Sequence, residues 1–478
     1  MTKHSTKTHS TILILYILLI NLFQLSVSRS FITSLPGFPG KLPFKLETGY
    51  VGLGEEDDLQ LFYYFVESER NPIDDPLLIW ITGGPGCSAL RPFFNQLGPL
   101  IFDYHDTYEK IPKLLVNPYS WTKVASVIFV DASGSGFSYA NTKDGLKTSD
   151  TLTSASIYEF LRKWLTDHPA FLNNPLYVSG LSYSGITVPV MVQDIINGNE
   201  AGNVPGLNIK GYMIGNPLTD RFIDFNSRIK FAHNFALLSD ELYESTKASC
   251  NGDYVNVNPA NGFCNRALAE VDKCLKDLNE HQILELNCDH MTVLQQWNKN
   301  SFKRNPVTGR VLAQLQDSDT WCRVDDYELV IAWATDEAVQ KALHVREGTT
   351  EWSKCNTDHY YLGRNDTDTY KYDIPSSIAY HRNLTKKNCR ALIYSGDHDM
   401  VFPYIGTRQW IRTLGLTVDR TWKPWFVKGQ VAGYTELFSH DDYSLTYATV
   451  KGAGHAAPET KPEQCLAMVD RWFADTRL

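Results

Sequence analysis

The sequence predicts an α/β fold in which helices cover both faces of a mainly parallel β-sheet. A chain of 478 residues with 43% hydrophobic content can bury a large core. Short runs rich in β-branched and aromatic residues alternate with helical patterns, and this alternation favours a parallel sheet. Strands are expected at Leu59 to Val66, Leu77 to Ile81, Ser126 to Val130, Leu176 to Val178, Gly211 to Ile214, Ala391 to Tyr394 and Leu445 to Val450.

The clearest helical pattern lies between the third and fourth of these runs. From Thr151 to Leu165, apolar residues recur at the spacing of one helix face. Asp150 or Thr151 is the expected N-cap, because short polar side chains accept hydrogen bonds from the first free amides of a helix.

The N-terminal 28 residues have the form of a signal peptide. Lys3 and Lys7 precede an apolar run from Thr11 to Leu25, and Ser26-Val27-Ser28 is a small-x-small cleavage sequence. The alternative is a membrane anchor, but the run is shorter than the ~20 residues of a spanning helix. We expect cleavage after Ser28, no stable membrane insertion afterwards, and entry into the secretory pathway.

Composition and missing motifs exclude several classes of partner. The formal net charge is -9, and no block of like charges could form a nucleic-acid-binding arm. The sequence lacks the HExxH, P-loop and dinucleotide fingerprints, so we expect no metal and no organic cofactor. The sequons at Asn365 and Asn383 agree with a secreted glycoprotein.

The cysteine-rich middle of the chain predicts an insertion into the core. We expect core residues at 29–219 and 327–478, with a disulfide-tied cap at 220–326 that holds five of the nine cysteines. Cys250 and Cys264 are predicted to pair, because only 14 positions separate them within one polar loop.

A sharp turn between a strand and a helix presents the candidate nucleophile, Ser182. The segment from Gly180 to Gly185 follows the strand LYV and precedes the helical pattern ITVPVMVQDII, which is the setting of a nucleophile elbow in the α/β-hydrolase fold. The alternative is an ordinary Gly-Ser-rich turn. The amide of Tyr183 and an amide of the Gly83 to Gly86 loop are the expected oxyanion-hole donors.

The acid and the base should follow later strands, in the chain order Ser, Asp, His. His455 lies among small residues directly after the run ending at Val450, and Asp397 and Asp399 both follow the run ending at Tyr394. The residue pattern alone does not choose between the two aspartates.

Eight ordered motifs resemble the serine carboxypeptidase-like proteins of plants, from about Phe31 to the C-terminus. They are LPFKLETGYVGLG, GGPGCSAL, NPYSWTKVASVIFVD, GSGFSYA, NPLYVSGLSYSG, YMIGNPLTD, YSGDHDMVFP and GAGHAAPE. The resemblance implies a Ser182, Asp399, His455 triad and an oxyanion hole formed by the amides of Gly84 and Tyr183.

The resemblance also implies covalent features. It suggests disulfides Cys87–Cys355 and Cys288–Cys322, which would leave Cys274, Cys389 and Cys465 as thiols. Related acyltransferases are sometimes cut within the insertion, and Lys303-Arg304 offers a site for such processing.

Three positions separate the two activities of this family. Carboxypeptidases hold a peptide carboxylate with Asn, Glu and Glu, and the resemblance places Thr82, Leu181 and Gln96 of this chain at those positions. Neither Leu nor Gln can share a proton with a carboxylate, so recognition of peptide C-termini should be weak. Leu181 is expected to face the acyl or acceptor pocket; alternatively, it packs beneath the loop.

The resemblance therefore favours the acyltransferase branch, whose members use 1-O-β-glucose esters as donors and a small molecule as acceptor. The expected location is the vacuole lumen, and the alternative is the extracellular space. The chain departs from that branch at Leu181, where Asp is usual, and in a 131–139 loop that is one residue short. A carboxypeptidase or esterase is the second hypothesis, and a catalytically silent binding protein is the third.

Overall fold

The computed structural model describes residues 29–103, 111–287, 302–304, 311–313, 323–348, 352–356, 359 and 366–478. The predicted signal peptide at 1–28, the predicted Cys288–Cys322 pair and the sequon at Asn365 lie outside these residues.

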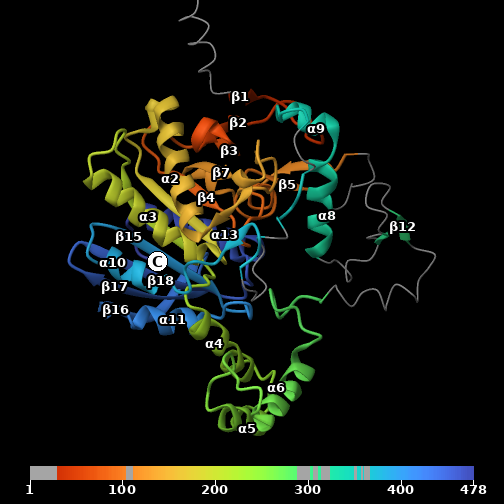
Figure 1. Cartoon of the computed structure of the whole chain (residues 1–478), viewed down its shortest axis with the longest axis vertical. Coiled ribbons are helices and arrows are strands. Elements are labelled where there is room, and N and C mark those ends of the chain that lie inside the picture. Colours follow the sequence, from red (N-terminus) through yellow and green to blue (C-terminus); the bar gives the residue numbers. More distant parts are fainter. Residues whose placement is uncertain are drawn as a thin grey trace, which may run out of the picture.

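A twelve-stranded sheet forms the centre of the molecule (Figure 1). Its strands run in the order β1-β2-β3-β7-β4-β10-β11-β15-β18-β17-β16, with β8 beside β3, and the six from β7 to β18 are parallel. The sheet strands are β1 (Arg29–Ile32), β2 (Leu46–Leu53), β3 (Leu59–Val66), β4 (Leu77–Ile81), β7 (Ser126–Val130), β8 (Tyr139–Ala140), β10 (Leu176–Leu181), β11 (Ile209–Gly215), β15 (Arg390–Gly396), β16 (Thr417–Val427), β17 (Gln430–His440) and β18 (Tyr443–Val450).

Helices and short strand pairs surround this sheet. The helices are α2 (Asp150–Asp167), α3 (Ser184–Glu200), α4 (Arg221–Asn234), α5 (Asp240–Cys250), α6 (Gly262–Leu275), α8 (Arg323–Ala334), α9 (Glu337–Ala342), α10 (Ile378–Leu384), α11 (Tyr404–Arg412), α12 (Ala457–Thr460) and α13 (Pro462–Phe473), with the short helices η1 (Glu55–Asp57), η2 (Pro92–Gln96), η3 (Trp121–Lys123), η4 (Asp144–Leu146) and η5 (Pro169–Phe171). The small pairs are β5 (Leu100–Phe102) with β6 (Leu114–Val116), β9 (Thr148–Ser149) with β14 (Tyr370–Lys371), and β12 (Phe302–Arg304) with β13 (Val311–Ala313).

Alternate residues of the central strands belong to two separate hydrophobic clusters, one on each face of the sheet. In β15, Leu392 and Tyr394 pack in the cluster that contains α8, α13 and η2, whereas Ala391 and Ile393 pack in the cluster that contains α2, α3, α10 and α11. Burial on both faces explains why these strands are continuous apolar runs. The structure confirms the predicted α/β architecture.

All seven predicted strands are present, and three have the predicted bounds. The sequence analysis missed the antiparallel strands at the sheet edges, β1, β2, β16 and β17. In β16, exposed and polar positions interrupt the alternation on which strand prediction depends.

The predicted N-cap of α2 was wrong by one or two residues. Ser149 is the cap, and its hydroxyl accepts a hydrogen bond from the Leu152 amide. Asp150 instead accepts hydrogen bonds from Tyr183, Tyr370 and the Ile374 amide, partners that lie far away in the sequence. Because the Asp150 side chain makes these tertiary contacts, Ser149 caps the helix instead.

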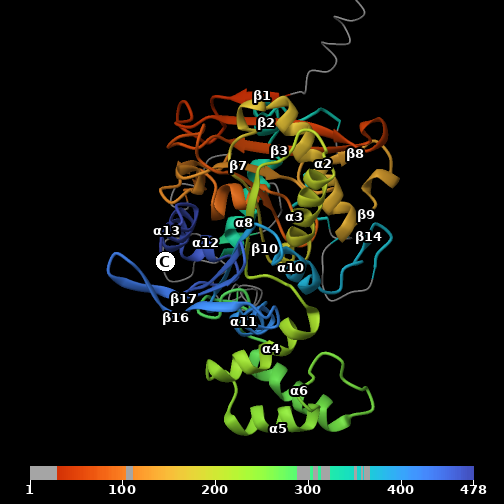
Figure 2. The same cartoon turned by 90° about the vertical axis from the view of Figure 1, so that its left-hand side faces the viewer.

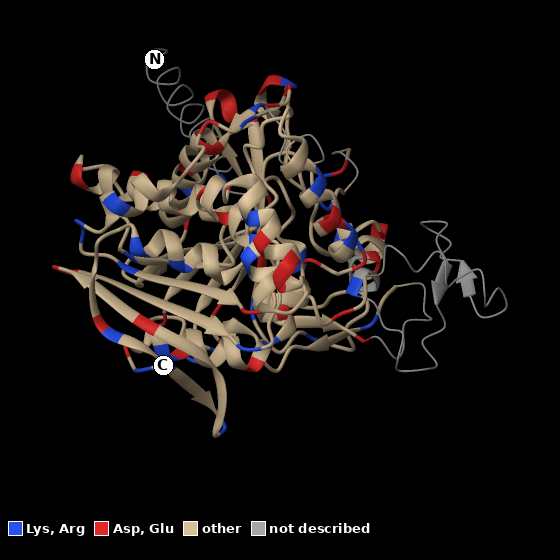
Figure 3. Ribbon diagram, turned by 90° about the horizontal axis from the view of Figure 1, so that it is seen from below, with Lys and Arg blue, Asp and Glu red and all other residues tan. Residues whose placement is uncertain are grey.

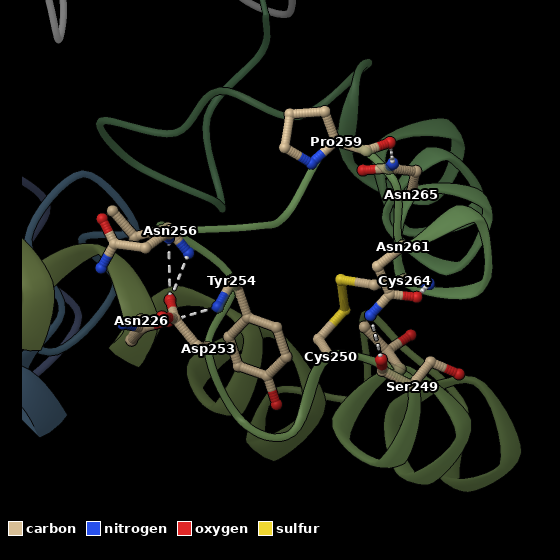
Figure 4. The surroundings of a disulfide bond; sticks show 12 residues. Asn226, Ser249, Cys250, Asp253, Tyr254, Asn256, Pro259, Asn261, Cys264 and Asn265 are labelled. Carbon is tan, nitrogen blue, oxygen red and sulfur yellow. Dashed lines mark hydrogen bonds between the residues drawn. A yellow bond between two sulfur atoms is a disulfide. The ribbon is translucent and has the colours of Figure 1, made fainter.

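Helices α4, α5 and α6 extend away from the sheet, and the chain after α6 returns toward it (Figures 1 and 2). A disulfide between Cys250 and Cys264 joins the end of α5 to the start of α6, as expected, and Asn261 reinforces it with a hydrogen bond to the Ser249 carbonyl (Figure 4). The domain boundaries at 220 and 326 stay a prediction. Lys303-Arg304 forms part of β12, within the predicted cap.

A second disulfide, between Cys87 and Cys355, spans 268 positions and ties the loop after β4 to residues 352–356. Cys274 is exposed, and Cys389 and Cys465 are buried thiols. Burial raises the pKa of the Cys389 thiol to about 12. The Cys87–Cys355 pair and these three thiols agree with the expectation from the family resemblance.

Charges of both signs are distributed over the ribbon without a large region of one sign (Figure 3). Among the residues that the structure describes, no helix is long and apolar enough to cross a membrane.

A fully buried carboxyl group, Asp224, fixes the start of α4 against the core. It accepts hydrogen bonds from the amides of Thr219 and Asp220, at 2.7 and 3.0 Å. Burial raises its pKa to about 7, despite those amides. Burial also raises the pKa of Asp131 and Asp150 to about 6.

We expect the three buried aspartates to stabilise the fold more in mild acid than at neutral pH. The folded protein binds these protons more tightly than the unfolded chain, whose aspartates have a pKa near 3.9. Their contribution to stability is therefore complete below about pH 4 and is lost as the pH rises to 7. The melting temperature at pH 5 minus that at pH 7.5, measured by calorimetry, should therefore be smaller in Asp224→Asn than in the parent. Asp441→Asn, at an exposed turn, is the matched control, and an unchanged slope in Asp224→Asn would contradict this account.

Candidate active site

Ser182 occupies a strained turn between β10 and α3. Its φ angle is 65°, in the left-handed region that side chains other than glycine rarely adopt. The turn is held by hydrogen bonds from the Ser182 amide to the Gly215 carbonyl and from the Gly185 and Leu218 amides to the Ser182 carbonyl, at 2.9 to 3.0 Å. This is the geometry of a nucleophile elbow, and Ser182 is only half-buried at its tip.

Small residues around the turn allow the strand and the helix to approach closely. A Cβ atom on Gly180 would lie 2.4 Å from the Ser184 Cβ, and one on Gly185 would lie 2.3 Å from the Leu218 carbonyl oxygen. Both distances are shorter than atoms tolerate, so larger residues would open the elbow.

The sheet order brings the three candidate triad residues to one edge. The parallel strands β10, β11, β15 and β18 are neighbours, and each is followed at its carboxyl end by a loop. Ser182 follows β10, Asp399 follows β15 and His455 follows β18. Ligand and catalytic sites of parallel sheets form at this edge.

Asp399 is completely buried and makes four hydrogen bonds. Its carboxylate accepts from His455 Nδ1 at 2.9 Å, the Asn216 amide group at 2.8 Å, and the backbone amides of Val401 and Phe402 at 2.8 and 3.3 Å. The bond to Nδ1 fixes the imidazole so that Nε2 is left for proton transfer, and His455 is only 7% exposed.

Asp397, the alternative acid, has a different role. Its carboxylate accepts a hydrogen bond from the Gly452 amide at 2.7 Å and lies 2.6 Å from His398 Nδ1. It therefore connects the loop after β15 to the loop that carries His455, while Asp399 contacts the imidazole itself.

Asn216 is a site residue that the sequence analysis missed. It follows β11, is fully buried, and donates to Asp399 while its side-chain oxygen accepts from the Gly396 amide at 3.1 Å. A polar residue directly after a buried strand, in IGNP, was the available signal.

The proposed oxyanion-hole residues flank Ser182. Tyr183 immediately precedes α3, so its amide lies at the N-terminus of that helix, where the helix dipole favours negative charge. The backbone of the Gly83-Gly84 turn packs against the nucleophile, since a Cβ on Gly83 would lie 2.9 Å from Ser182 Cβ and 3.0 Å from the Tyr183 nitrogen. Glycine at these positions permits two main-chain donors beside one reacting oxygen.

Asp150 anchors the side chain of Tyr183. Its carboxyl group accepts from the hydroxyls of Tyr183 and Tyr370 at 2.7 and 2.8 Å, and from the Ile374 amide at 3.0 Å. The sequence analysis did not identify this contact, because α2, α3 and the residues near 370 meet only in the folded protein.

The three predicted substrate-binding residues have different surroundings. Thr82 lines a small cavity together with Pro85, Tyr183 and Tyr370. Gln96 is 3% exposed and lines a second cavity, which also contacts Glu459. Leu181 is 6% exposed and packs in the hydrophobic core, so the burial favours the alternative in which this side chain packs beneath the loop.

The arrangement suits acyl chemistry at a serine. A nucleophile on an elbow, a histidine held by a buried carboxylate and adjacent main-chain donors are the parts that acyl transfer requires. Within the described part of the chain, no group of three His, Cys, Asp or Glu residues is arranged to hold a metal.

We expect Asn216→Ala to slow the reaction of Ser182 with a fluorophosphonate probe by about tenfold or more. The variant removes one of four donors to Asp399, and losing a hydrogen bond to a buried charge costs about 1.5 to 3 kcal/mol. Probe labelling followed by mass spectrometry gives the rate. Asn203→Ala, which removes an exposed hydrogen bond to Tyr158, should react like the parent. Labelling of Asn216→Ala at the parental rate would contradict this role.

Comparisons with known proteins give the family. The sequence profile named serine carboxypeptidase matches residues 36–475. Two Arabidopsis thaliana proteins are each 43% identical to this chain: serine carboxypeptidase-like 7, over 97% of this chain and 98% of that protein, and serine carboxypeptidase-like 17, over 96% of each.

Among solved structures, a prohormone-processing carboxypeptidase from Saccharomyces cerevisiae superimposes with a TM-score of 0.70 at 20% identity, over 93% of this chain and 94% of that one. This likeness confirms the α/β-hydrolase fold. The profile match and the two plant relatives show that the chain belongs to the serine carboxypeptidase family.

Proposed function

We propose that this family member is an acyltransferase that moves an acyl group from a 1-O-β-glucose ester to the hydroxyl of a small acceptor, through an acyl-Ser182 intermediate. Two features together support the proposal. The chain has an ordered acid-base pair, and it has neutral residues at the positions where the family's carboxypeptidases bind a carboxylate. The hydrogen bond between Asp399 and His455 supports serine chemistry, whereas Thr82, Leu181 and Gln96 disfavour peptide C-termini.

The argument from the neutral residues rests on the residue types at these positions. Gln96 is 3% exposed, and a carboxylate brought beside it would lose water without an acid at position 96 with which to share a proton. A neutral, uncharged substrate such as a sugar ester avoids that cost.

The first half of the reaction would form the acyl-enzyme. Ser182 Oγ attacks the ester carbonyl while its proton passes to His455 Nε2, and the amides of Gly84 and Tyr183 stabilise the oxyanion. The bond between the carbonyl carbon and the glucose oxygen then breaks, and the imidazolium returns the proton to the departing sugar.

The second half would transfer the group. The acceptor hydroxyl gives its proton to His455 and attacks the acyl carbonyl, and the bond to Ser182 Oγ breaks as the serine regains the proton. Asp399 stabilises the imidazolium in both halves. Each step requires only side chains and backbone amides of this chain.

We place this activity in the secretory pathway, with the vacuole lumen as the favoured compartment. Nine cysteines with two disulfides suit an oxidising route. Asn383 is exposed near the end of α10 and could accept a glycan, although its amide contacts Gln193 at 3.2 Å. The raised pKa of the buried Asp224 favours stability in an acidic lumen.

The test offers purified protein a panel of 1-O-acyl-β-glucoses with a mixture of hydroxyl acceptors, and a blocked dipeptide in parallel. We expect release of glucose, formation of new acyl esters, and an acyl adduct on the peptide that contains Ser182. Ser182→Ala should lose all three, as measured by mass spectrometry. Efficient cleavage of the dipeptide without transfer would favour the carboxypeptidase or esterase hypothesis instead, and no reaction of the parent with a fluorophosphonate would favour a silent binding protein.

We expect the triple variant Thr82→Asn, Leu181→Glu, Gln96→Glu to lose acyl transfer and to gain measurable peptide hydrolysis. The variant restores the residue types with which the family's peptidases bind a carboxylate, and a glutamic acid can share its proton with that carboxylate. Initial rates on an acyl glucose and on a blocked dipeptide measure the change. Because Leu181 lies in the core, fluorophosphonate labelling serves as the control for folding. A labelled variant with parental transfer and no hydrolysis would contradict the assignment of these positions.

A further inference from the structure

Residues 279–287, which follow α6 within the predicted insertion, fold against both loops of the triad. The Met400 amide donates to the Glu280 carbonyl at 2.9 Å, and the Ile283 amide donates to the His398 carbonyl at 3.2 Å. These bonds join the 279–287 segment to the loop that carries Asp399.

The same segment binds the loop that carries the histidine. The His455 amide donates to the His281 carbonyl at 2.6 Å, and the Gln282 side-chain amide donates to the Gly452 carbonyl at 3.0 Å. Gly454 permits this approach, since a Cβ on it would lie 2.3 Å from the His281 oxygen. The backbone of His281 is thus bonded directly to the residue that we assign as the general base.

The two imidazole rings also contact each other. The ring centroids of His281 and His455 are 5.2 Å apart with the planes inclined by 68°, an edge-to-face arrangement, and the Phe402 ring lies 5.7 Å from the His455 ring. His281 is exposed to solvent whereas His455 is 7% exposed. The ring of His281 therefore covers part of His455 from water.

Desolvation, more than nearby charge, keeps the ring of His281 neutral. Desolvation is the largest cause that lowers the pKa of His281; the neighbouring His455, Arg91 and Lys354 lower it further, while Asp399 opposes them. A neutral ring can pack beside His455 in either of its protonation states.

Further contacts hold the 279–287 segment rigidly. The Asn279 side chain accepts a hydrogen bond from the His281 amide at 3.0 Å. At the other end, Arg323 forms ion pairs with Glu285 and with the buried Glu459, which lies four residues after His455. The segment is therefore attached to α12 as well as to both loops.

We propose that His281 is a positioning residue for the general base: its carbonyl fixes the backbone of His455, and its ring orients the imidazole and excludes water from one side of it. The inference rests on the proposed function only in taking His455 as the base that activates Ser182. It assigns to the insertion a part in the chemistry, in addition to any part in covering the substrate.

The test measures the rate at which a fluorophosphonate labels Ser182 between pH 5 and pH 8.5 in the full chain and in three variants. His281→Ala removes the ring, His281→Phe keeps an aromatic ring without nitrogen atoms, and His233→Ala is the control. His233 also belongs to the predicted insertion, where it stacks on Tyr243 and pairs with Asp240.

We expect His281→Ala to label at least tenfold more slowly and to need a higher pH, because water entering beside His455 stabilises the imidazolium and leaves less of the neutral base. His281→Phe should stay within about threefold of the parent at each pH, and His233→Ala should match it. Melting temperatures identify any variant that fails to fold. If His281→Ala fails to fold, the labelling rate of His281→Phe relative to the parent tests the proposal. The parental rate and pH profile in His281→Ala, or a His281→Phe as slow as His281→Ala while folded, would overturn the proposal.

This probe does not depend on the natural substrate. If the parent labels normally but transfers no acyl group, the proposed function fails while the role of His281 stands. If the parent transfers acyl groups and the variants behave alike, only the role of His281 fails.

Discussion

The buried carboxylate of Asp399 is the constraint on which the geometry of the candidate site depends. A charge with no exposure to water must be satisfied by hydrogen bonds or the folded state loses several kcal/mol. Its four donors come from three places: the loop after β11, its own loop and the histidine loop. The need to satisfy one charge therefore fixes three loops relative to one another, and the position of the imidazole follows.

The 279–287 segment adds a second set of contacts to the same site. Main-chain bonds from Glu280, His281 and Ile283 reach the two loops that Asp399 already connects. Backbone bonds of this kind depend little on side-chain identity, but they require a glycine at Gly454, where the two segments approach closely. The 279–287 segment and the two loops are thus hydrogen-bonded together at this point.

The family assignment and the proposed activity rest on different features of the chain. The profile match and the plant relatives establish the family, whose carboxypeptidases and acyltransferases share one kind of acyl-serine chemistry. What separates the two activities is which molecules reach the acyl group. In the function that we propose, the neutral Thr82, Leu181 and Gln96 bear on that choice, since the cost of binding a carboxylate depends on acids that this chain lacks at these positions.

The sequence by itself determined the parallel core, the elbow at Ser182 and the histidine at His455, because each depends on local order: apolar runs, small residues around a sharp turn, and a polar residue directly after a strand. It also determined the Cys250–Cys264 pair, whose members are close in the chain. The choice of Asp399 over Asp397 came from family resemblance. The structure explains the choice, because the carboxylate of Asp399 contacts the imidazole and that of Asp397 does not.

Only the tertiary structure decided the contacts made by Asn216, Asp150 and His281. Their partners lie 33 to 224 positions away, and no local pattern records which distant loop a buried polar group will meet. For the same reason, the local pattern did not predict that Ser149, rather than Asp150 or Thr151, caps α2.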